Sequence, residues 1–364
     1  MFSTKLDDII DLVDTFDPSE YGRSRNFIDG NVSRLSPYIS RGVISTRFVY
    51  NRLIGRGFDP QKIEKYIQEL TWRDYWQQIW VHKGKTIDED LKTSQLDVNN
   101  YGISKNIIDA QTGIDAIDNA ILEFYKTGYL HNHLRMYLAA MACNIGKSHW
   151  TVPARWMYYH LFDADWASNA LSWQWVAGTN SNKKYYANQD NINKYCYGTQ
   201  KHTFLDHPYE ELISMEVPAE LKETVNLKLS TVLPAEHSID LVPGKPTIIY
   251  NFYNLDPFWK NDIKANRVLL LEPSHFSSYP VSEKSINFLL DLSKNIEGLQ
   301  LYTGEFSELK KEISTGKIYY KEHPLNTHYS GIEESRDWMS EISGYFPSFF
   351  VFWKKVKKDL LSKN

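Results

Sequence analysis

Helical periodicity over one long stretch is the feature that most limits how this chain can fold. From Ser36 to about Trp175, apolar side chains recur every three or four residues, and strand-like alternation is scarce. The stripe is clearest in Lys62–Trp80, and other helices are expected at 1–16, 115–126 and 131–144. We therefore expect a mainly α fold in which residues 1–204 form an all-helical domain.

The pattern changes after about residue 205. Residues 205–246 include polar stretches and three prolines near their end, and we interpret them as a linker or strap. Short apolar runs typical of strands follow, separated by helical stretches. The expected strands are 247–250, 268–271, 299–302 and 317–320, and the expected helices are 282–296 and 305–314. This alternation is typical of a small parallel α/β unit, expected at 247–364. It contains neither GxGxxG nor a P-loop, so nothing there predicts a nucleotide site.

The charge balance limits the classes of partner. The net charge of −4 does not predict binding to a polyanion by bulk charge. Residues 21–200 nevertheless carry 21 basic against 16 acidic side chains. This modest surplus is compatible with contacts to phosphates, and equally with an ordinary solvated surface.

Cysteine usage and the N-terminus favour a cytoplasmic protein. Cys143 and Cys196 are too few for a disulfide framework or a cysteine metal cluster. The acidic N-terminus lacks the apolar core of a signal peptide, and no apolar run reaches the about 18 residues of a membrane span. We therefore expect no membrane partner. His131 and His133 lie two residues apart and point apart on a helix, so we also expect no metal site.

Several polar residues do not suit a plain helical core. Asn132 and Arg135 are three residues apart and share a helix face. Asp163, Asp165 and Asn169 bring two carboxylates and an amide to one short stretch beside two tryptophans. Buried polar groups need partners, and a flavin ring offers an N–H group and carbonyl oxygens to such side chains. The combination therefore indicates a flavin site.

Five motifs, in this order, resemble the photolyase/cryptochrome flavoproteins over most of residues 21–180. They are Ser33-Arg34-Leu35-Ser36; Glu69 with Trp72 and Arg73; Thr112 and Gly113 with Asp118; His131 and Asn132 with Arg135 and Met136; and Asp163, Asp165, Asn169, Trp173, Gln174 and Trp175. The resemblance implies an all-helical, photolyase-type FAD-binding domain, here followed by the small α/β unit.

The resemblance also implies how FAD is held. The residues expected at the phosphates and ribityl chain are Tyr21, Ser33, Leu35, Ser36 and Arg73. Those expected around the ring and the adenine are Asn132, Arg135, Asp163 and Asp165. Asn169 matches the residue that faces flavin N5. Trp173 matches the flavin-proximal electron donor and Trp150 the next one, and no metal is implied.

The implied activity is that of a carbon–carbon lyase, deoxyribodipyrimidine photolyase-like, in which photoexcited reduced FAD donates an electron to a cyclobutane pyrimidine dimer in DNA. Glu69, Asn132 and Met136 match the residues that contact the flipped dimer. Trp72 and Trp175 match the walls that stack on its bases. In the (6-4)-photoproduct branch, a histidine would be expected at the position of Met136.

Four features depart from the family pattern. The α/β unit follows the flavin domain instead of preceding it, and we expect no second, antenna chromophore in it. Val32 replaces a usual threonine in the phosphate loop. Asp97 falls near the third tryptophan of the photoreduction chain, which leaves three alternatives: Tyr101 takes its place, another aromatic does, or the chain is shorter. His133 stands where the family usually has an arginine that holds DNA, and Ala187 lies near another expected arginine, so single-stranded DNA should be an easier substrate than duplex. The basic residues that remain are Arg25, Arg34, Lys183 and Lys184.

Other interpretations stay open. Trp72, Trp76 and Trp80 recur at helical spacing, which is typical of core packing as well as of a site. Besides repair, the same residues fit a cryptochrome-like blue-light sensor without repair activity, or a flavin-binding remnant without light chemistry. Fold alone does not decide between these functions.

Overall fold

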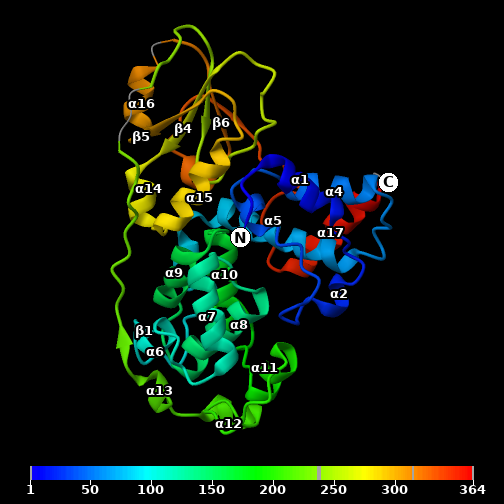
Figure 1. Ribbon diagram of the computed structural model, residues 1–364, viewed down its shortest axis with the longest axis vertical. Coiled ribbons are helices and arrows are strands. Elements are labelled where there is room, and N and C mark those ends of the chain that lie inside the picture. Colours follow the sequence, from blue (N-terminus) through cyan, green and yellow to red (C-terminus); the bar gives the residue numbers. More distant parts are fainter. Residues whose placement is uncertain (1, 236–238, 314, 363–364) are drawn as a thin grey trace. The chain divides into compact units, whose positions relative to one another are not determined.

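The computed structural model describes residues 2–235, 239–313 and 315–362 (Figure 1). Residues 1, 236–238, 314 and 363–364 are outside the described residues. The predicted helices at 1–16 and 305–314, the predicted linker and the predicted α/β unit each include some of these positions. Contacts divide the chain into two compact units. Unit 1 comprises Met1–Pro18, Ser33–His82 and Ser230–Asn364, and unit 2 comprises Ser19–Val32 and Lys83–Leu229. This division differs from the predicted split at residues 204 and 246, because residues 33–82 belong to the same unit as the α/β segment.

Unit 2 is built from helices and one two-stranded ladder. Its helices are α2 (Tyr21–Ser24), the 3₁₀ turn η1 (Gly84–Asp88), α6 (Lys105–Ile108), α7 (Asp115–Thr127), α8 (Asn132–Ala140), the π turn η2 (Met141–Ile145), α9 (Thr151–His160), α10 (Trp166–Ala177), α11 (Gln189–Cys196), α12 (Tyr209–Ser214) and α13 (Ala219–Lys222). Strands β1 (Ile103–Ser104) and β2 (Thr224–Val225) pair antiparallel. The predicted helices at 115–126 and 131–144 are confirmed by α7 and by α8 with η2.

The Thr-Gly…Asp motif determines where α7 begins. Asp118 accepts hydrogen bonds from the Thr112 and Gly113 backbone N–H groups, at 2.9 and 3.0 Å, and from the Thr112 hydroxyl at 2.7 Å. These bonds tie the two residues of the preceding loop to the first turn of the helix, whose N-cap residue, Ile114, makes no side-chain cap bond. Gly128 ends the helix with a left-handed φ of 66°. A β carbon there would meet the Phe162 ring at 2.4 Å, so glycine is required on two grounds.

Unit 1 combines helices with a parallel sheet. Its helices are α1 (Leu6–Thr15), α3 (Ser36–Ser40), α4 (Thr46–Gly55), α5 (Glu64–Lys83), α14 (Pro273–Ser278), α15 (Glu283–Ser293), α16 (Phe306–Glu312), the 3₁₀ turn η3 (Pro324–Asn326) and α17 (Phe349–Ser362). Its strands are β3 (Thr247–Tyr250), β4 (Asn266–Leu271), β5 (Leu299–Thr303), β6 (Ile318–Lys321) and β7 (Ile332–Glu334). They lie in the order β5-β4-β3-β6-β7, and every pair is parallel. The predicted strand–helix alternation is confirmed, with β7 as an additional edge strand.

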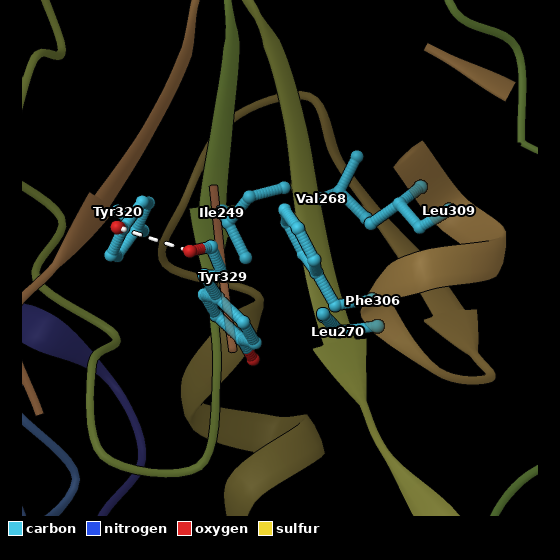
Figure 2. Packing of buried hydrophobic residues seen from close by; sticks show 7 residues of the cluster. All are labelled: Ile249, Val268, Leu270, Phe306, Leu309, Tyr320 and Tyr329. Atoms are coloured by element: carbon cyan, nitrogen blue, oxygen red, sulfur yellow. Dashed lines mark hydrogen bonds between the residues drawn. The ribbon is translucent and has the colours of Figure 1, made fainter. Parts of the chain in front are cut away.

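An apolar cluster lies between the sheet and α16. Figure 2 shows its members, which come from β3, β4, β6, α16 and the loop after β6; they are Ile249, Val268, Leu270, Phe306, Leu309, Tyr320 and Tyr329. The rings of Phe306 and Tyr329 stack at 4.4 Å. Beside the rings, Glu272 accepts a hydrogen bond from the Tyr329 hydroxyl at 2.8 Å, which satisfies the buried polar groups.

Helix α5 carries a buried carboxylate, Asp74, that joins three parts of unit 1. Its oxygens accept hydrogen bonds from the Thr46 hydroxyl at 2.9 Å and from the Met339 backbone N–H at 3.0 Å. Burial disfavours the charged form and raises the pKa of Asp74 to about 6, although both hydrogen bonds oppose the shift.

Asp74 is expected to make unit 1 less stable as the pH rises from about 4 to about 6. In that window the folded form binds more protons than the unfolded form, so this group's contribution to stability falls by at most about 3 kcal/mol. The amide introduced by Asp74→Asn keeps an acceptor oxygen but has no charge. Denaturant unfolding across this pH range should therefore show a smaller loss of stability in the variant. Equal pH profiles for both proteins would contradict the expectation.

Candidate functional site

The residues proposed from sequence divide between the two units. Unit 1 holds Ser33, Leu35, Ser36, Glu69, Trp72 and Arg73. Unit 2 holds Tyr21, Asn132, Arg135, Met136, Trp150, Asp163, Asp165, Asn169, Trp173 and Trp175. Within each unit, these side chains make specific contacts that define what they can bind.

An ion pair lies at the centre of the unit 2 group. Arg135 on α8 donates from Nη2 to Asp163 Oδ2 at 3.0 Å and from Nε to the Leu130 carbonyl at 2.8 Å. Only 21% of the Arg135 side chain and 7% of the Asp163 side chain are exposed. An ion pair this far from water is costly unless its remaining hydrogen-bonding capacity is used.

Helix α10 begins beside this pair with two further polar residues. Asp165 is its N-cap and accepts a hydrogen bond from the Ser168 backbone N–H at 3.0 Å. Asn169, 8% exposed, lies one turn further on and donates to the Ala154 carbonyl at 2.8 Å. The group therefore offers carboxylate acceptors, a guanidinium donor and an amide in a largely buried setting. This donor set fits the polar edge of an isoalloxazine ring.

The start of α8 separates an exposed face from a buried one. Asn132 is exposed and Met136, one turn later, is half-buried. His131 is the N-cap, and its Nδ1 accepts from the His133 backbone N–H. His133 itself is buried, with Nδ1 at 2.8 Å from the Asn26 carbonyl oxygen, and burial lowers its pKa. His133 is thus a packed interior side chain and does not add to the surface charge of unit 2.

The three tryptophans of the unit 2 group differ in exposure. Trp173 and Trp150 are buried, at 2% and 0% exposed. The Trp150 indole N–H donates to Asp90 Oδ1 at 2.8 Å. Trp175 is 39% exposed, and its ring lies 6.0 Å from that of Tyr185. Trp175 therefore offers aromatic surface to a ligand, whereas the other two belong to the protein interior.

In unit 1, Arg73 connects α5 to the phosphate-loop motif. Its Nη2 donates to the Ser36 carbonyl at 3.2 Å. Leu35 is buried and is the N-cap position of α3, so Ser36 is the first residue of that helix rather than its cap. The bond from Arg73 joins the first residue of α3 to α5.

The substrate-side residues of unit 1 lie on one face of α5. Glu69 is paired with Lys65 at 3.2 Å and stays 30% exposed. Trp72 stacks face to face on Phe349 of α17, with ring centroids 3.6 Å apart and planes 8° apart. One face of the Trp72 ring is therefore covered by the C-terminal helix. Sequence reasoning missed Phe349, since no local pattern signals a contact between segments so far apart in the chain.

Lys184, one of the four basic residues expected to contact DNA, forms an ion pair within the protein. Lys184 donates to Asp97 Oδ2 at 3.0 Å and to the Leu96 carbonyl at 2.9 Å. Asp97, which stands near the position of a third electron-transfer tryptophan, thus holds a lysine instead. Ala187 is buried.

The described residues contain neither a membrane-spanning helix nor a cluster of metal ligands. None of their helices is long and apolar enough to cross a membrane. Across the same ranges, no group of three or more His, Cys, Asp or Glu side chains is arranged to hold a metal ion.

Comparison with known proteins places the unit 2 geometry in context. Residues 66–209 match the family model for the FAD binding domain of DNA photolyase. A deoxyribodipyrimidine photo-lyase of Alkalihalophilus pseudofirmus is 28% identical over 173 residues, covering 46% of this chain and 36% of the relative. One from Agrobacterium fabrum is 27% identical over 203 residues, covering 49% and 42%. A solved cryptochrome structure from Synechocystis is 22% identical, with a TM-score of 0.48, covering 53% of this chain and 44% of that one.

The matched segment, which contains the polar cluster, is similar to the FAD binding domain of DNA photolyase. Over this segment the chain resembles the photolyase/cryptochrome flavoproteins. The chain spans less than half the length of these curated relatives.

Proposed function

We propose that this protein is a light-driven DNA-repair lyase that splits cyclobutane pyrimidine dimers. The observation that carries the proposal is the buried Arg135–Asp163 pair beside Asp165 and Asn169, within the segment that matches the photolyase FAD-binding domain. When bound, reduced FAD supplies a photoexcited electron donor. The protein's own residues bind it, orient it and hold the substrate.

FAD is the single chromophore in this proposal. The residues assigned to its phosphates and ribityl chain are Tyr21, Ser33, Leu35, Ser36 and Arg73. Those assigned to its ring and adenine are Asn132, Arg135, Asp163, Asp165 and Asn169. The absorption spectrum of the purified protein tests this directly. A protein that is colourless, and stays so after FAD is added, would rule the assignment out.

Five side chains are assigned to the substrate on the strength of the family resemblance. Glu69 and Asn132 offer polar groups to the base edges, and Met136 offers a thioether. Trp72 and Trp175 would stack on the two bases, a contact typically worth about 1–3 kcal/mol per base. Damaged bases are also less costly to flip than intact pairs.

Single-stranded DNA is proposed as the easier substrate. His133 and Ala187 are buried, and Lys184 is bound to Asp97, so three positions near the expected DNA-holding charges contribute little to phosphate binding. Duplex DNA must also be bent and unpaired, which costs additional free energy. Weak phosphate contacts should therefore reduce binding to duplex first.

A blue-light sensor without repair activity is the second candidate, and one contact favours it. Phe349 covers a face of Trp72 on which a flipped base would otherwise stack. A protein that binds FAD and photoreduces it, yet repairs no dimer when fully reduced, would support this alternative over repair.

Replacing Trp173 with phenylalanine is expected to slow blue-light reduction of oxidised FAD severely. Trp173 is the proposed proximal donor, and phenylalanine keeps an aromatic ring but is much harder to oxidise. Steady-state absorbance under illumination measures the rate. Trp156→Phe is the matched control, since Trp156 is also buried in unit 2. A Trp173 variant that photoreduces as fast as this control would show that another residue is the donor.

A further inference from the structure

A surface tyrosine is joined to the buried Trp150 by an aromatic contact. The Tyr101 ring is stacked on the His149 ring, with centroids 5.2 Å apart and planes 25° apart. The His149 ring lies 6.0 Å from the Trp150 ring. Tyr101 is 69% exposed, whereas Trp150 is 0% exposed. The three rings thus lead from the interior of unit 2 to solvent.

Backbone pairing holds the two outer rings in register. The Asn99 backbone N–H donates to the Lys147 carbonyl, and the His149 backbone N–H donates to the Asn100 carbonyl, both at 2.8 Å. The Ser148 hydroxyl adds a bond to Asn100 Oδ1 at 3.0 Å. Tyr101 follows directly in this paired segment. Its stack on His149 is therefore supported by backbone contacts and does not depend on a freely rotating surface loop.

The Asp90 carboxylate lies beside the rings of His149 and Trp150, where it would stabilise a positive charge on either ring. Asp90 Oδ1 accepts from the Trp150 indole N–H at 2.8 Å and lies 3.4 Å from His149 Nε2. Its other oxygen accepts from the Gln95 backbone N–H at 2.7 Å. An anion at this distance in a partly buried setting favours an oxidised, positively charged indole.

The other aromatic neighbour of Trp150 leads inward. Trp166 lies 6.4 Å from Trp150, and Tyr158 lies 5.4 Å from Trp166. These two are 0% and 1% exposed, so neither meets a solute. The path through His149, by contrast, takes Trp150 to an exposed aromatic.

We propose that Tyr101 is the terminal electron donor of the photoreduction chain and that His149 bridges it to Trp150. This rests on the proposed function and on the expectation that Trp150, the electron donor after Trp173, is oxidised by one electron. Tyr101 then gives one electron to the Trp150 radical cation, which returns to the closed-shell indole. The phenolic proton leaves to solvent at the same time, and a neutral tyrosyl radical remains at the surface.

A low-molecular-weight thiol completes the cycle. It transfers one electron and one proton to the Tyr101 radical, which restores the phenol. Two thiyl radicals from two such events combine into one disulfide. The exposure of Tyr101 makes this collision feasible without any opening of the unit.

The test locates the radical in the FAD-loaded protein rather than measuring activity. The protein is illuminated with blue light and a nitroso spin trap, without thiol, and the adduct is mapped by peptide mass spectrometry. We expect the adduct on Tyr101 in the wild type and its loss in both Tyr101→Phe and Trp150→Phe. Tyr197→Phe is the matched control, because Tyr197 is 62% exposed in the same unit. It should leave the Tyr101 adduct unchanged.

Two results would overturn the proposal. One is an adduct on Tyr101 that persists in Trp150→Phe, which would mean direct oxidation of an exposed phenol. The other is photoreduction with thiol that proceeds in Tyr101→Phe at the wild-type rate. A separate measurement addresses the proposed function: protein reduced chemically with dithionite bypasses the chain. Tyr101→Phe should then repair dimers like the wild type, so failure of repair in both proteins counts against the function and not against the assignment of Tyr101.

Discussion

Replacing Arg135 with methionine is expected to give protein that purifies without FAD. Methionine fills similar space but removes the guanidinium that donates to Asp163 and to the Leu130 carbonyl. The Asp163 carboxylate, 7% exposed, is then left without its ion-pair partner. Breaking such a pair costs up to about 3 kcal/mol here, since Arg135 retains some exposure to water. Flavin absorbance per protein after purification, with and without added FAD, is the measurement.

A double variant separates loss of the cofactor from loss of folding. Arg135→Met with Asp163→Asn removes both charges, so the cost of the unpaired carboxylate disappears while the donor to the flavin is still missing. The midpoint temperature of thermal unfolding should be higher in the double variant than in Arg135→Met, and FAD should still be absent. Lys126→Ala, a surface change with 74% of the lysine side chain exposed, should retain FAD. Full FAD occupancy in Arg135→Met would exclude Arg135 from the site.

Local patterns in the sequence were sufficient for most helices and strands. The helix predicted at 115–126 matches α7 to within one residue. The apolar runs before and after α15 predict the parallel strands, since a strand covered on both faces is apolar along its length. β7 was missed because it is short, polar and at the edge of the sheet, so it carries no apolar signal.

Long-range packing is what the sequence did not reveal. The grouping of residues 33–82 with the α/β segment depends on contacts such as the one between Asp74 and Met339, which leave no mark on local periodicity. Phe349 against Trp72 is of the same kind. The candidate site was accessible from sequence through residue types, because buried Arg, Asp and Asn side chains need polar partners. Their spatial relations were not.

The sequence alone also does not show which motif residues have a structural role and which can bind a ligand; their contacts in the structure do. Thr112 and Gly113 donate hydrogen bonds to Asp118 and so join the loop before α7 to its first turn, which gives this motif a local structural role. His133 was identified as a replaced arginine, but only its contact with the Asn26 carbonyl shows that it faces the interior. The histidine at position 133 therefore contributes to packing inside unit 2, and it does not act as a surface charge.

Replacing Glu69 or Trp72 with alanine is expected to reduce repair of cyclobutane dimers strongly in prereduced protein. Loss of a charged hydrogen-bond partner typically costs about 1.5–3 kcal/mol, and loss of base stacking about 1–3 kcal/mol. Each corresponds to a fall of roughly 5- to 150-fold in the apparent affinity for the dimer. Dimer loss is measured under blue light on single- and double-stranded oligonucleotides at several substrate concentrations. Glu123→Ala, at a carboxylate 63% exposed on α7, is the control.

Trp72→Ala also removes packing against Phe349, so a second variant is needed to interpret it. Phe349→Ala leaves Trp72 in place and uncovers the ring face on which Phe349 stacks at 3.6 Å. If that face receives a base, repair by Phe349→Ala should be at least as fast as in the wild type, whereas Trp72→Ala remains slow. If both variants lose repair equally while still binding FAD, the stack supports the fold of unit 1 and Trp72 does not contact the dimer. Repair that is unaffected by Glu69→Ala and Trp72→Ala together would mean that the dimer binds elsewhere on the protein.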